Sequence, residues 1–252
     1  MELTTLSIAL AVGAALLVGV TKTGMPGLAI PCVVMMAEAF PGNTRLSVGA
    51  LLPILIVGDV FAITIYRRHA QWHRLWRLFP LVVLGMIPGA FVLYHSGGGS
   101  SGADRLRPIL GGLVLALLLL ELARRRFNLD RFAEHRWVTY LTGIVAGFGT
   151  IVGNAAGPVM SVYLVSRKMK KHELIGTAAW FFFIVNVSKV PVYSSIGMIT
   201  RQTLLFDLAL APLVVVGALF GARVMKLVPQ KLFDTLVLLL AGIAALWMLV
   251  PR

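Results

Sequence analysis

The stretch PLVVLGMIPGAFV at residues 80–92 recurs as PLVVVGALFGARV at residues 212–224, with eight of thirteen positions identical. One proline and two glycines recur at fixed spacing, so chance similarity between two apolar stretches is a poor explanation. With a small change of offset the match extends to three more pairs: Gly27 with Gly157, Ser47 with Thr177, and Asp59 with Lys189. The sequence therefore predicts a chain of two related halves.

The composition places both halves in a membrane. Of 252 residues, 58% are hydrophobic and 13% are charged, and the mean hydropathy is +0.89. A soluble domain is about 45–50% apolar and about 25% charged, so this chain has too few polar residues to cover a surface that faces water. Intrinsic disorder is excluded, because it requires low hydrophobicity. We expect an all-α, polytopic membrane protein.

Ten apolar segments can be marked, and most approach the length of about 20 residues that a membrane-spanning helix needs. They cover residues 4–22, 24–40, 46–66, 78–94, 106–123, 137–153, 156–167, 173–195, 203–222 and 231–250. Helix-breaking junctions follow the first and sixth segments. The first two segments, and the sixth and seventh, are therefore expected either as full spans or as broken, re-entrant hairpins.

These segments predict 8–10 transmembrane segments in two five-segment repeats. We expect a first repeat at residues 1–123, a cytoplasmic linker at 124–136 and a second repeat at 137–252. Because five is odd, the second repeat enters the membrane in the inverted orientation. Inverted repeats of this kind are typical of secondary transporters.

The basic residues indicate the orientation. Four loops on one side of the ten predicted segments hold 16 of the 23 Lys and Arg residues. By the positive-inside rule that side is cytoplasmic, so both termini are expected outside, in the periplasm, with the protein in the inner membrane. Topology then explains the net charge of +13, and no nucleic acid partner is expected. Since no basic residue precedes the first segment, we expect that segment to be retained rather than cleaved as a signal peptide.

Enzymatic and metal chemistry find little support. All five histidines lie in loops or at segment edges, and the single Cys32 excludes an internal disulfide or a cysteine-based metal site. A phosphate-binding G-x-x-x-x-G-K-[ST] motif is absent. We expect no enzyme activity, no cofactor and no bound metal.

Three ionisable residues stand out within the apolar segments, where a charge costs about 2.5–3.5 kcal/mol. These are Lys22, Asp59 and Lys189. Asp59 and Lys189 are interpreted either as a buried ion pair that fixes packing or as a coupling or gating carboxylate and an anion-attracting lysine. For Lys22, extension of the side chain to water is an alternative. Glu38, Glu121 and Asp207 lie near segment ends and are expected to reach water.

The two junctions, at residues 23–27 and 153–158, are predicted to begin helices inside the membrane. A helix N-terminus presents unpaired N–H groups and the positive end of the helix dipole, which attract anions. The alternative is a pair of turns that allow close packing. The expected substrate-binding residues are Lys22, Thr23, Gly24, Gly27, Asn154, Ala155, Gly157, Thr177, Asn186 and Lys189. For Thr177 and Asn186, hydrogen bonding between helices is an alternative role.

Several motifs resemble the TauE/SafE family of membrane permeases, also called the sulfonate uptake permease family. The resemblance covers nearly the whole chain, and its motifs are GVTKTG at 19–24, LP at 52–53, GDVF at 58–61, YRRH at 66–69, NAAGP at 154–158, GTAAWF at 176–181, Asn186, and KVP at 189–191. It implies transport of sulfite or of an organosulfonate such as sulfoacetate.

We therefore expect a secondary transporter that moves a small sulfur-containing anion through the lipid bilayer by alternating access, with Asp59 in coupling or gating. An anion channel of the same fold and a transporter of a different small anion are alternatives, and so is a membrane scaffold that transports nothing. The coupling ion (a proton or sodium) and a homodimeric state are left open.

Overall fold

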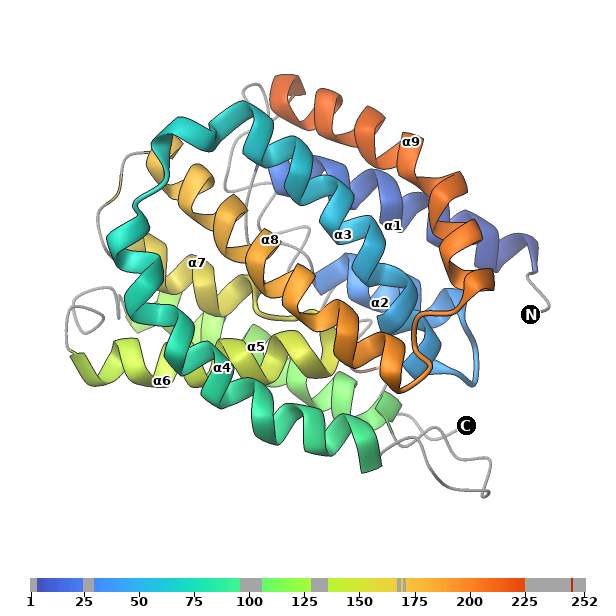
Figure 1. Cartoon of the computed structure of the whole chain (residues 1–252), viewed down its shortest axis with the longest axis horizontal. Coiled ribbons are helices and arrows are strands. Elements are labelled where there is room, and N and C mark those ends of the chain that lie inside the picture. The colour runs from blue at the N-terminus through green and yellow to red at the C-terminus, as the bar shows by residue number, and fades with distance from the viewer. Residues whose placement is uncertain are drawn as a thin grey trace.

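The computed structural model describes residues 4–24, 30–95, 106–127, 136–166, 169, 171–224 and 246, and within these ranges all regular secondary structure is helical (Figure 1). The elements are α1 (Thr5–Gly24), α2 (Ile30–Ala39), α3 (Thr44–Tyr66), the 3₁₀ turn η1 (Arg67–His69), α4 (Trp72–His95), α5 (Leu106–Phe127), α6 (Arg136–Gly153), α7 (Gly157–Ser166), α8 (Lys171–Ser195) and α9 (Arg201–Val224). The predicted all-α class is confirmed. The tenth predicted segment, 231–250, falls outside the described ranges except for residue 246.

Five stretches of the described chain are long and apolar enough to cross a membrane: Thr5–Gly24, Thr44–His69, Trp72–His95, Glu173–Ser195 and Arg201–Arg223. By contrast, α2 and α7 have 10 residues each, about 15 Å of helix against a hydrocarbon core of about 30 Å. The second and seventh predicted segments are therefore half-length helices and not full spans.

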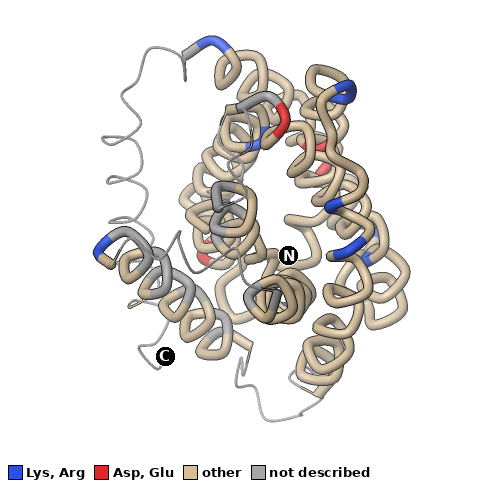
Figure 2. The backbone as a smooth tube through the Cα atoms, turned by 90° about the vertical axis from the view of Figure 1, so that its left-hand side faces the viewer, with Lys and Arg blue, Asp and Glu red and all other residues tan. Residues whose placement is uncertain are grey.

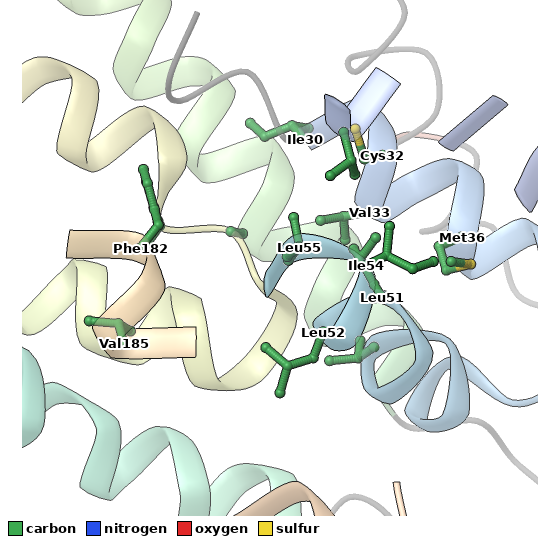
Figure 3. Packing of buried hydrophobic residues seen from close by; sticks show 14 of the residues in the cluster. Ile30, Cys32, Val33, Met36, Leu51, Leu52, Ile54, Leu55, Phe182 and Val185 are labelled. Carbon is green, nitrogen blue, oxygen red and sulfur yellow. The ribbon is translucent and has the colours of Figure 1, made fainter. Parts of the chain in front are cut away.

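Helix α2 lies inside the protein. Most of its residues are buried, and Cys32, Val33 and Met36 pack near Leu51 and Leu55 of α3 (Figure 3). A helix that is apolar on all sides needs apolar neighbours all round, and the surrounding helices provide them. Helix α2 is thus part of the protein interior.

Two helix pairs join the halves of the chain, α1 with α9 and α4 with α6. Gly217 lies against the backbone of Leu16, and Gly221 lies against that of Val20, so α9 runs parallel to α1. In the same way Gly85 lies against Ile144, and α4 runs parallel to α6. The glycines of the repeated stretch therefore allow close helix packing, the role that small residues at this spacing usually have in membranes.

Helices α3 and α8 cross the middle of the structure side by side (Figure 1). Gly49, near the start of α3, lies against Met198, which follows α8, whereas Gly176 near the start of α8 lies against the carbonyl of Tyr66. The two helices are therefore antiparallel. These relative directions agree with ten segments that cross the membrane in alternating directions. The inversion of the two halves stays a prediction.

Candidate functional site

Few charged residues are buried among the helices, which are tan or grey along most of their length in Figure 2. In the described part of the chain they are Lys22, Asp59, Lys189 and Asp207. Burying a charge without a partner is costly, so each of these side chains needs either a partner or a function. The first three lie in one polar network between α1, α3, α6 and α8.

The carboxylate of Asp59 is bonded on both oxygens. Lys22 Nζ lies 2.6 Å from Oδ1, and Asn186 Nδ2 donates to Oδ2 at 2.7 Å. Gly58 makes the first contact possible, because a Cβ there would come within 3.0 Å of Lys22 Cγ. Asp59 on α3 is therefore tied to α1 of its own half and to α8 of the other.

Lys189 is fully buried and has oxygen acceptors for all three of its N–H groups. Its Nζ donates to Asn154 Oδ1 at 2.6 Å, Thr150 Oγ1 at 3.0 Å and the Thr150 carbonyl at 3.2 Å. These acceptors lie at the C-terminal end of α6, the negative end of the helix dipole. Asp59 and Lys189, considered above as an ion pair, therefore do not bond to each other. Asp59 pairs with Lys22 instead, and Lys189 donates to uncharged oxygens.

Although Lys189 is not hydrogen-bonded to Asp59 or Lys22, the three charged groups interact electrostatically. Lys189 is close enough to Asp59 and to Lys22 for electrostatic interaction with both, and Asn186 is one helical turn from Lys189 on α8. Two ammonium groups share the network with one carboxylate. When all three are ionised, the network carries one excess positive charge.

Lys22 retains hydrogen-bonding capacity. Of its three N–H groups, one donates to Asp59, and no other acceptor contacts the ammonium among the described residues. The ammonium also lies over the ring of Phe182, 4.5 Å from the centroid, where the face of the ring attracts a cation. The other two N–H groups of Lys22 are therefore without a hydrogen-bond acceptor among the described residues.

The break between α6 and α7 borders this network. Asn154 has φ 55°, in the left-handed region that few residues other than glycine adopt, and its Nδ2 donates to the carbonyl of Val48 at 2.9 Å. The first backbone bond of α7 runs from Met160 N–H to the Ala156 carbonyl, and Pro158 has no N–H. Helix α7 thus begins at Gly157, three residues after Asn154, which accepts a hydrogen bond from Lys189.

Other predicted site residues lie elsewhere or serve packing. The hydroxyl of Thr23 donates to the carbonyls of Gly19 and Ala218, at the α1–α9 contact. Thr177 accepts from the N–H of Gln71, about 18 Å along α8 from Lys189. Gly24 ends α1, Ala155 N–H donates to the Gly149 carbonyl, and Gly157 begins α7. Gly27 lies outside the described residues.

Three further residues were not predicted as site residues. Thr150 is one helical turn before Asn154, and Phe182 is one turn before Asn186, so helical spacing from predicted residues was the available signal. Asp207 was expected to reach water from a segment end, and this was wrong: it is 4% exposed. Its helix packs against α1 and α3, which cover it.

Comparison with known proteins gives one match. A family model described as "Sulfite exporter TauE/SafE" matches residues 7–248. No curated protein and no solved structure matches the chain. The family match covers both halves and every residue of the buried network, and five helices of the described chain are long and apolar enough to span a bilayer. This multi-pass membrane protein therefore belongs to the TauE/SafE sulfite exporter family, a family of membrane transporters and not of enzymes.

Proposed function

We propose that the chain is a secondary transporter that carries sulfite or an organosulfonate such as sulfoacetate across the inner membrane by alternating access, with both termini in the periplasm. The observation that carries this proposal is that two buried lysines, Lys22 and Lys189, lie in the network with a single carboxylate, Asp59. When all three groups are ionised, one monovalent sulfur oxyanion, such as bisulfite or a sulfonate group, would neutralise their excess positive charge. The family description supports sulfur as the central atom.

In this proposal the anion binds Lys22 between Phe182 and the N-terminus of α7. Lys22 offers its remaining N–H groups, and the first turn of α7 offers unpaired backbone N–H groups and the positive end of a helix dipole. Lys189 adds positive charge while its own N–H groups bond Thr150 and Asn154. In this conformation Lys189 would thus attract the anion through its positive charge, without a hydrogen bond to it.

Asp59 would act as the gate. It competes with the anion for Lys22 and at the same time joins α3 to Asn186 on α8. Binding of an anion weakens the contact between Asp59 and Lys22 within the first half, and Asp59 is then free to move relative to Asn186 of the second half. The central side chains are 0–8% exposed, which fits an occluded carrier better than an open pore.

Counterflow in proteoliposomes tests this function. Vesicles are loaded with unlabelled sulfite, sulfoacetate, sulfate or thiosulfate, and the entry of the corresponding labelled anion is followed. We expect saturable counterflow with at least one sulfur anion, and a fall of about tenfold or more in Lys22→Gln and Lys189→Ala. Arg201→Ala is the matched control, because Arg201 is exposed at the start of α9, and it should transport normally.

Two outcomes would contradict parts of the proposal. Full counterflow in correctly inserted Lys189→Ala would remove this residue from the site. Flux that does not saturate and shows no counterflow would identify a channel instead of a carrier.

A further inference from the structure

The carboxyl group of Asp207 on α9 is buried and has no hydrogen-bonding partner. Neither Oδ1 nor Oδ2 contacts a donor in the described chain, whereas both oxygens of Asp59 are bonded. At 4% exposure the side chain is shielded from bulk water. Since a buried, unpaired carboxylate is strongly disfavoured in protein and in lipid, Asp207 is more stable in this conformation as the neutral acid.

The helices that pack against α9 provide no counter-charge. α9 packs against α1 and α3, and the contacts of Gly217 with Leu16 and Gly221 with Val20 place Asp207 level with the first turns of α1. Lys22 is at the opposite end of α1 and pairs with Asp59.

The remaining charged groups near Asp207 in the described chain also form no ion pair with it. Arg45 on α3 donates to the carbonyl of Ile196 at 3.1 Å. Glu38 lies two residues before Phe40, whose ring packs edge-on against Phe206. On α9 itself, Arg201 and Arg223 are exposed near the two ends. No described basic side chain comes within salt-bridge distance of Asp207.

The four buried charges balance in two states. With the anion site empty, Lys22 and Lys189 are neutralised by Asp59 and an ionised Asp207, a state that requires a different conformation in which water reaches the carboxylate of Asp207. With one monovalent anion on the central network, the charges balance only when Asp207 carries a proton. Because net charge is costly within a bilayer, the protein changes orientation most readily in these two neutral states.

We propose that Asp207 binds one proton each time the central network binds one monovalent anion, so that proton and anion cross the membrane together as an electroneutral pair. This inference rests on the proposed transport function and names its coupling ion. A metal cation would need several oxygen ligands, and the described residues contain no group of three or more His, Cys, Asp or Glu side chains that could hold one. A proton needs only the carboxyl oxygen.

Infrared spectroscopy of the purified protein in lipid tests the proton site, with spectra recorded at neutral pH before and after the addition of sulfite. In wild type, sulfite should increase the C=O stretch of a protonated carboxylic acid and decrease the bands of an ionised carboxylate. Asp207→Asn should lack this change, and Asp207→Glu should restore it at a shifted position. The same sulfite-induced band in wild type and Asp207→Asn, or no such band in wild type, would overturn the proposal.

Transport in proteoliposomes with a pH-sensitive dye inside tests the coupling, with sulfite as the anion. The bisulfite–sulfite equilibrium moves protons equally in both proteins, so the difference between them belongs to Asp207. We expect wild type to move about one more proton per anion than Asp207→Asn, and the ratio of net, pH-driven uptake to counterflow to fall about tenfold or more in the variant. Equal proton movement in the two proteins would refute the coupling. If wild type carries no sulfur anion while the infrared band is present, the transport function fails and the proton site stands.

Discussion

At the scale of the residue, the buried ion pair of Lys22 and Asp59 decides how the site is assembled. The pair is 2.6 Å apart with Asp59 fully buried, and the second oxygen of Asp59 accepts from Asn186. A buried pair adds little to stability compared with apolar side chains of similar size, but breaking it leaves an uncompensated charge. The pair is therefore better explained by function than by stability.

Replacing only one residue of the Lys22–Asp59 pair should destabilise the protein more than replacing both. Asp59→Leu leaves the Lys22 ammonium unpaired and should lower the free energy of unfolding by about 3–5 kcal/mol. Combining it with Lys22→Met should recover most of this loss but no transport, because the anion-binding ammonium is gone. Denaturant unfolding in detergent and sulfite counterflow measure the two properties. Additive losses in the double variant would contradict a direct pair.

At the scale of the element, the glycines of the repeated stretch set the distance between helices. Gly217 and Gly85 lie directly against the backbones of α1 and α6, at Leu16 and Ile144. Close approach of this kind is a main source of helix association in membranes, where lipid is as apolar as the helix surface. The two pairs, α1–α9 and α4–α6, each bind one half of the chain to the other.

Adding one methyl group at either glycine should therefore push apart the two helices that meet there. Gly217→Ala and Gly85→Ala should each destabilise the protein by about 1–3 kcal/mol, because the new Cβ has no room beside a neighbouring backbone. Gly112→Ala on α5 is the matched control. A Cβ there has nothing within 4 Å, and removing a helical glycine should stabilise by about 0.5–1 kcal/mol. Equal losses at all three positions would point to a general intolerance of substitution in these helices.

At the scale of the whole molecule, the halves are bonded to each other near both ends of α3. At the start of α3, Arg45 Nη2 donates to the carbonyl of Ile196 at 3.1 Å. Beyond its end, Gln71 donates through its backbone to Thr177 Oγ1 and through Nε2 to Glu173 Oε2, both at 2.9 Å. Alternating access requires contacts of this kind to open one end at a time.

A cross-link at one end should therefore stop the cycle. Cysteines at Gln71 and Glu173, in a Cys32→Ala background, should form a disulfide under oxidation and reduce sulfite counterflow by about tenfold or more. Reductant should restore transport. The single variant Gln71→Cys, treated in the same way, controls for oxidation. Counterflow at the full rate in the cross-linked protein would show that this end does not open.

The amino-acid sequence alone determined the membrane class, the helical fold and most of the polar residues at the centre. Composition and apolar segment length predict the membrane class and the helical fold, because few backbone structures are stable inside a bilayer. Lys22, Asp59, Asn154, Asn186 and Lys189 stood out because polar groups in apolar segments are rare. At residues 153–158 the glycine junction left either a full span or a broken helix open, and α6 and α7 are separate helices there.

The tertiary structure alone decided which of these residues meet. The repeat aligned Asp59 with Lys189, yet Asp59 pairs with Lys22, because the packing of α1 against α3 brings this lysine to it. Asp207 lies near the start of its segment, where the sequence predicted contact with water, and α9 buries it against its neighbours. Segment length and hydropathy are properties of one helix, whereas a side chain's partner and exposure depend on how helices distant in sequence pack together.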